Sequence, residues 1–229
     1  MIPRFIVSAL WAGVIALDFT GFGPFMVSQP MVCGPIFGWL LGRISVGVIL
    51  GGIVQLIWMD VTPVGVGIPF DTTAVTLLAV YWATLTPHES LSQIILALLI
   101  AVPFGYLFRA MDFYARRLNT LIVRRIERVS DDHLPAAMNV GIIGGLAWSW
   151  ARYAVFYAFS MWAGERLWTR LAYSPRMTWI DQGLTMAVIL LPVAGMGVAL
   201  ELFLLEDPEG RLTSLRHLRL PGRRRGDAQ

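Results

Sequence analysis

The possible fold of this chain is constrained most by seven apolar blocks, each near the length that crosses a lipid bilayer. They cover 5–22, 25–42, 44–60, 73–87, 91–111, 136–163 and 182–205. A transmembrane helix needs about 20 mainly apolar residues. Only 14% of the 229 residues are charged, against about 25% in a typical soluble domain, and the mean hydropathy is +0.65. The pattern predicts an all-α, polytopic membrane protein with about six to seven membrane segments, and it argues against a soluble enzyme.

The second and third blocks are interrupted by helix-breaking residues. These are Pro24, Pro30, Pro35, Gly38, Gly42, Gly47, Gly51 and Gly52. In lipid, freed backbone groups must be satisfied by protein or by a water-filled cavity, so broken or re-entrant segments mark the binding sites of transporters. For the glycines, close helix packing is the alternative interpretation. The block at 25–42 is the one that we expect not to cross fully.

The stretch 60–71 is apolar but cannot form a regular helix. Pro63, Gly65, Gly67 and Pro69 recur every two residues along it, and proline removes a helix hydrogen bond. We therefore predict a re-entrant loop that enters the protein interior, with an ordinary extracytoplasmic loop as the alternative.

Arginines set the expected orientation, since the chain has no lysine. Six of them lie among apolar residues in 109–128, a spacing that predicts a basic, amphipathic helix on the membrane surface and not a nucleic-acid site. By the positive-inside rule, this segment and the Arg-rich tail should both be cytoplasmic. The expected organisation is an N-terminal membrane region at 1–108, the basic segment at 109–135, a membrane hairpin at 136–205 and the tail at 206–229.

Polar residues that we expect to be embedded in the membrane are the candidate functional groups, because such residues are costly there. They are Asp18, Ser28, Gln29, Gln55, Asp60, Asp71 and Arg152. Asp18 either pairs with Arg152 in a buried ion pair or contacts a ligand. Asp71 either caps the helix that begins near Thr72 or lies on a substrate path. We expect no metal or other cofactor, and we interpret Cys33 as a small buried hydrophobic residue.

The first six of these candidate polar residues belong to a pattern of three stretches, 16–30, 34–42 and 47–59, the last of which continues into Pro63-Val-Gly and Pro69-Phe-Asp71. In this order they resemble the IIC membrane subunit of the mannose/fructose/sorbose family of bacterial phosphotransferase-system (PTS) sugar transporters. The resemblance covers about residues 10–205 and is most specific in the first third of the chain.

The resemblance implies a sugar-translocating subunit of the bacterial inner membrane that is not catalytic on its own. In this family the IIC subunit forms a hetero-oligomer with a related IID membrane subunit, and cytoplasmic IIA and IIB (IIAB) proteins phosphorylate the emerging sugar from a histidine. The histidines of this chain agree with that division of labour, since His88, His133 and His217 all fall in predicted loops or the tail.

Four residues are predicted to line the sugar path: Ser28, Gln29, Gln55 and Asp71. Gln supplies donors and an acceptor, which a ring of sugar hydroxyls requires. Many family members have Gln at the position of Pro24, Arg at Gln29 and Glu at Gln55, so this chain has a more neutral site. The alternative hypothesis is a membrane scaffold or regulator that derives from a IIC subunit and does not transport.

Overall fold

The described part of the chain is helical throughout. The computed structural model describes residues 3–18, 21, 23, 25–59, 70–86, 90–126, 134–172 and 177–205. Within these ranges it contains seven α-helices and no strand: α1 (Arg4–Ala16), α2 (Pro30–Leu40), α3 (Ile44–Ile57), α4 (Thr72–Ala83), α5 (Leu91–Ile126), α6 (Leu134–Ala172) and α7 (Met177–Leu205). This confirms the all-α class. Pro24, the predicted re-entrant loop up to residue 69, the three histidines and the tail lie outside the described residues.

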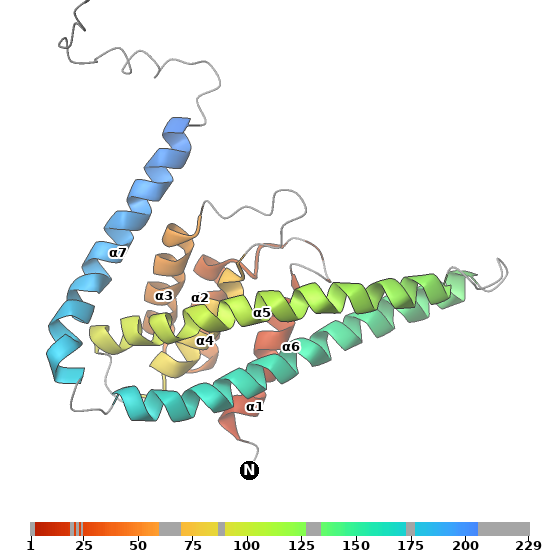
Figure 1. Cartoon of the computed structure of the whole chain (residues 1–229), viewed down its shortest axis with the longest axis horizontal. Coiled ribbons are helices and arrows are strands. Elements are labelled where there is room, and N and C mark those ends of the chain that lie inside the picture. The colour runs from red at the N-terminus through yellow and green to blue at the C-terminus, as the bar shows by residue number, and fades with distance from the viewer. Residues whose placement is uncertain are drawn as a thin grey trace, which may run out of the picture.

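Helices α2 and α3 form a short antiparallel hairpin (Figure 1). Pro30 opens α2 at a position where its missing N–H costs no helix hydrogen bond. Gly42, with φ +81°, ends it. The 11 and 14 residues of the two helices rise by about 17 and 21 Å, less than the roughly 30 Å of a bilayer core. Neither helix alone is therefore long enough to cross; whether the block at 25–42 crosses the membrane stays a prediction.

The hairpin is held at glycines, where the two backbones touch. A Cβ on Gly34 would lie 2.5 Å from the Gly47 carbonyl oxygen, and a Cβ on Gly47 would lie 2.1 Å from the Gly34 carbonyl oxygen. A Cβ on Gly51 would meet the Pro30 carbonyl oxygen at 2.3 Å. Close packing is therefore the role of these glycines, and it is the second of the two interpretations offered above. Gly52 differs, since a Cβ there would meet no atom within 4 Å.

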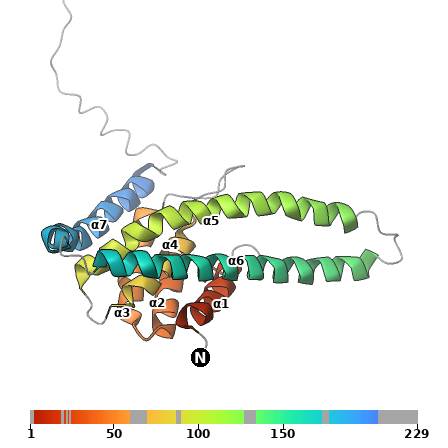
Figure 2. The same ribbon diagram turned by 60° about the horizontal axis from the view of Figure 1, so that its bottom comes forward.

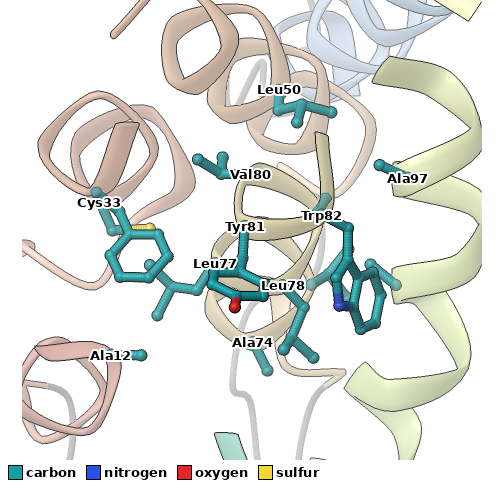
Figure 3. Close-up of a cluster of buried hydrophobic side chains, with 14 of the residues drawn as sticks. Ala12, Cys33, Leu50, Ala74, Leu77, Leu78, Val80, Tyr81, Trp82 and Ala97 are labelled. Atoms are coloured by element: carbon teal, nitrogen blue, oxygen red, sulfur yellow. The ribbon is translucent and has the colours of Figure 1, made fainter. Parts of the chain in front are cut away.

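Helix α4 is the centre of the bundle. Every residue from Ala74 to Ala83 is buried, which fits a helix that is apolar on all sides. Trp82 lies against α6, where a Cβ on Gly164 would be 2.1 Å from its indole ring. Figure 3 shows side chains of the surrounding helices that face α4, namely Ala12 of α1, Cys33 of α2, Leu50 of α3 and Ala97 of α5. Cys33 is fully buried.

Helices α5 and α6 are long and lie side by side, extending away from the other helices (Figures 1 and 2). The 36 residues of α5 rise by about 54 Å. Residues 109–126 are helical and continue α5 without a break, so the expected boundary after residue 108 falls inside a helix. The reason is local, because no proline or glycine follows Gly105 before residue 126. The position of this segment relative to the membrane stays a prediction.

Two stretches of the described helices are long and apolar enough to cross a membrane alone, Leu91–Ala115 and Ile180–Glu201. The second, in α7, is almost entirely unburied within this chain. Its exposed side chains include Ile189, Leu190 and Val193, which a bilayer or a partner subunit would cover. The total of six to seven membrane segments stays a prediction.

Candidate functional site

The backbone of Ser28 forms hydrogen bonds with a residue at the end of α1 and with another at the beginning of α4. The Ser28 N–H donates a hydrogen bond to Oδ2 of Asp18 at 3.0 Å. The Thr73 hydroxyl, in the first turn of α4, donates to the Ser28 carbonyl oxygen at 2.7 Å. Asp18 and Ser28 are both buried. These two hydrogen bonds hold the turn that precedes α2 against α1 and α4. We call this region the α2–α4 junction; it consists of Asp18, Ser28, Asp71 and Thr73.

Asp71 immediately precedes α4 and caps it. Its Oδ1 accepts a hydrogen bond from the Ala74 N–H at 2.6 Å, so the capping role suggested by the sequence is present. Capping does not exclude contact with a ligand, because the N–H groups at the start of a helix favour nearby polar or anionic groups. The junction thus places a carboxylate and the beginnings of two helices, α2 and α4, close together.

Gln29 contributes to the structure through its backbone. Its carbonyl oxygen accepts hydrogen bonds from the N–H groups of Val32 and Cys33, both at 2.8 Å, at the start of α2. Its side chain makes no capping bond and the residue is exposed. The amide of Gln29 is therefore available at the edge of the junction, with both donors and an acceptor.

Gln55, on α3, carries a buried amide oxygen with no hydrogen-bond partner in the described part of the chain. An unsatisfied buried polar group costs about 1–3 kcal/mol, so a ligand hydroxyl that donated here would recover this cost. Three residues on, the Trp58 ring stacks on Phe70 with a centroid distance of 5.2 Å. Since Phe70 adjoins Asp71, this contact brings the end of α3 beside the beginning of α4.

Arg152, on α6, pairs with a different aspartate from the one that the sequence suggested. Its Nη2 donates to Oδ1 of Asp112, on α5, at 3.2 Å, and Asp18 is instead bound to the Ser28 N–H. The Tyr153 hydroxyl donates to the same Asp112 oxygen at 3.1 Å. The interpretation of Asp18 and Arg152 as an ion pair is thus corrected, because the long α5–α6 contact supplies Arg152 with a nearer carboxylate.

Sequence reasoning missed Asp112 because it lies in the arginine-rich segment that we assigned to the membrane surface. One signal was available, since Asp112 is the sole acidic residue in 109–126. It also missed two further polar groups of α6, on Tyr157 and Ser160. The Tyr157 hydroxyl and the Ser160 hydroxyl are buried and have no hydrogen-bond partner in the part of α6 and its neighbours that the structure describes.

A glycine-packed hairpin, two apolar stretches long enough to cross a membrane and buried polar groups at helix beginnings are features of helical membrane proteins. The sequence profile of the family described as "PTS system sorbose-specific IIC component" matches residues 2–207. The chain therefore belongs to this family, as its motifs indicated. Its members are membrane components of sugar permeases.

A related sequence is known in Escherichia coli (strain K12). The protein named "Putative N-acetylgalactosamine permease IIC component 2" is 30% identical over 77 residues, which are 34% of this chain and 55% of that protein. The matched region thus spans about half the length of this curated relative.

Two solved structures share the fold. One, titled "Structure of membrane protein", has a TM-score of 0.69 and 18% sequence identity. The other is the cryo-EM structure of the mannose transporter ManYZ in complex with microcin E492 (MceA), with a TM-score of 0.59 and 16% identity. Each match covers 93% of this chain and 82% of the other chain. At these identities the similarity establishes the fold alone.

Proposed function

We propose that this chain is the membrane-embedded IIC subunit of a PTS sugar permease, which translocates a sugar across the inner membrane for phosphorylation by a cytoplasmic IIB subunit. Membership of the family supports this function. The α2–α4 junction is the observation that carries it, because it gathers polar groups where two helices begin inside an otherwise apolar bundle.

The proposed mechanism is an exchange of hydrogen bonds. A sugar that enters the protein loses water, and each hydroxyl needs a donor or an acceptor in return, worth about 0.5–1.5 kcal/mol net. Asp71 offers a strong acceptor, Gln29 offers an exposed amide, and Gln55 offers a buried oxygen that lacks a donor. Ser28 contributes its hydroxyl, while its backbone holds the junction together.

The partners that we propose are a IID membrane subunit and cytoplasmic IIA and IIB (IIAB) proteins, in a hetero-oligomer. The exposed apolar face of α7 supports a membrane partner. Met186, Ile189, Leu190, Val193 and Met196 are all more than half exposed within this chain. A surface of this kind requires either lipid or another membrane subunit.

Sugar uptake tests the proposed function directly. Cells that lack the gene should lose uptake and phosphorylation of one PTS sugar, and the restored gene should recover both when IID and IIAB are present. Uptake that is intact in the deletion strain, together with altered activity of other PTS components, would favour the scaffold hypothesis.

Replacing Asp71 with Asn should separate capping from sugar binding. Asn caps helices about as well as Asp, so we expect α4 and the thermal stability of the protein to be retained. Loss of the carboxylate should lower the apparent sugar affinity about tenfold, which corresponds to about 1.4 kcal/mol. Uptake kinetics measure the effect, with Asp71→Ala as the variant that loses both roles. Unchanged kinetics in Asp71→Asn would leave capping as the sole role.

Replacing Gln55 with Leu should lower the apparent sugar affinity about tenfold while expression is retained, because Leu is better tolerated than Gln in an apolar interior. Gln93→Leu is the matched control, since Gln93 also has a buried amide oxygen without a partner but lies in the first turn of α5. Uptake kinetics and protein levels are measured for both. Equal effects of the two changes would assign Gln55 to helix packing.

Membrane orientation gives a further prediction. The loop near Ser130 and the tail near Ser214 should both be cytoplasmic, because each adjoins an arginine cluster. Single cysteines at these positions, in a Cys33→Ala background, should resist an impermeant thiol reagent in intact cells and react after permeabilisation. Efficient labelling of either in intact cells contradicts the orientation.

A further inference from the structure

A pocket of about 420 Å³ lies where α1 begins, at the opposite end of α1 from Asp18. Arg4, Val7 and Ser8 of α1 line it, together with Leu40 and Leu41 at the end of α2. It is therefore separate from the α2–α4 junction, and no step of the proposed transport mechanism uses it.

Arg4 is held in place by the ends of two other helices. Its Nη2 donates to the Leu41 carbonyl oxygen at 3.3 Å and to the Thr84 hydroxyl at 3.4 Å. Leu41 is the C-cap residue of α2 and Thr84 is the C-cap residue of α4. The C-terminal end of a helix carries a partial negative charge that favours a cation. This arrangement fixes the guanidinium while its other nitrogens form no hydrogen bond to the described residues.

Apart from Ser8, the remaining walls of the pocket are apolar, and two of their side chains are open to the surroundings of the bundle. Val7 and Leu40 are 44% and 39% exposed, and the adjacent Trp39 is 71% exposed. Exposed tryptophans of membrane proteins gather at the level of the lipid headgroups. None of the five lining residues is acidic, so the formal charge of the pocket is positive. A ligand that matches it has an anionic head and an apolar chain.

We propose that this pocket binds an anionic phospholipid, with the headgroup phosphate on Arg4 and Ser8 and an acyl chain along Val7 and Leu40. Arginine recognises phosphate through charge-assisted hydrogen bonds, and apolar walls add affinity that a free phosphate ion cannot use. The bound lipid would contact the beginning of α1 and the end of α2, and through Arg4 it would act on the end of α4. This site goes beyond the proposed sugar path.

Lipid titrations of the purified full chain in mild detergent test the proposal. Phosphatidylglycerol should raise the unfolding temperature at low concentration, while phosphatidylcholine and inorganic phosphate at equal concentration should not. Arg4→Gln, which removes the charge, should weaken the phosphatidylglycerol effect about tenfold. Val7→Trp keeps the charge but fills the pocket, and it should weaken the effect by a similar factor. Arg170→Gln, an exposed arginine outside the pocket, should leave it unchanged.

The readout is the shift caused by lipid and not the starting stability, because Arg4 also binds two helix ends. If the Arg4→Gln variant does not fold, the lipid-induced shift of the Val7→Trp variant tests the proposal by itself. The proposal is overturned if Val7→Trp binds phosphatidylglycerol as the unchanged protein does, if inorganic phosphate reproduces the stabilisation, or if phosphatidylcholine is equally effective.

Discussion

Replacement of Asp112 by alanine is expected to destabilise the folded chain by about 3–5 kcal/mol, because it leaves a buried guanidinium without its counter-charge. The side chains of Asp112 and Arg152 are only 11% and 13% exposed, and their atoms approach to 3.2 Å. The Tyr153 hydroxyl loses its acceptor in the same variant. In addition, Nε and Nη1 of Arg152 already lack a hydrogen-bond partner among the described residues, so no other hydrogen bond of these two atoms would compensate for the loss of Asp112.

A double-mutant comparison separates the net contribution of the Asp112–Arg152 ion pair to the free energy of unfolding from the penalty of leaving one buried charge unpaired. Asp112→Leu and Arg152→Met should each be strongly destabilising alone, whereas the double variant should recover most of the loss, since apolar replacements of a buried ion pair are often neutral. Denaturant titration in detergent provides the measurement, with Glu201→Ala as an exposed acidic control on α7. A change below about 1 kcal/mol for Asp112→Ala would show a pair screened like one at a surface.

Replacement of Gly47 by alanine is expected to disrupt the α2–α3 hairpin. The new Cβ would lie 2.1 Å from the Gly34 carbonyl oxygen, which is a backbone atom and cannot rotate away as a side chain can. The two helices must therefore separate, at a cost of about 1–3 kcal/mol or more. Because the junction lies at the start of α2, we expect sugar uptake to fall together with stability.

Gly52→Ala is the matched control, with the same substitution in the same helix. A Cβ at Gly52 meets no atom within 4 Å, and alanine stabilises a helix interior by about 0.5–1 kcal/mol over glycine. The two variants should therefore shift the unfolding temperature in opposite directions. Equal shifts would mean that the glycines of α3 do not set the distance between the two helices.

The sequence alone predicted the all-α class, because blocks of apolar residues near bilayer length leave helices as the simplest way to satisfy the backbone. It also located the interrupted region, because Pro30 and Gly42 constrain their own backbone whatever surrounds them. The motifs around Asp18, Gln55 and Asp71 placed the chain in its family, which the match over residues 2–207 confirmed. All of these are local properties or properties of residue order.

Tertiary structure decided which polar groups meet. Arg152 and Asp112 are 40 positions apart, and only the side-by-side course of α5 and α6 brings them together; periodicity in either segment gives no information about the other. Likewise, Ser28 meets Thr73 across 45 positions, so its backbone role was invisible in the sequence. The sequence also could not distinguish Gly47 from Gly52. Gly47 touches the backbone of the facing helix and Gly52 does not, and this difference arises only when the helices pack.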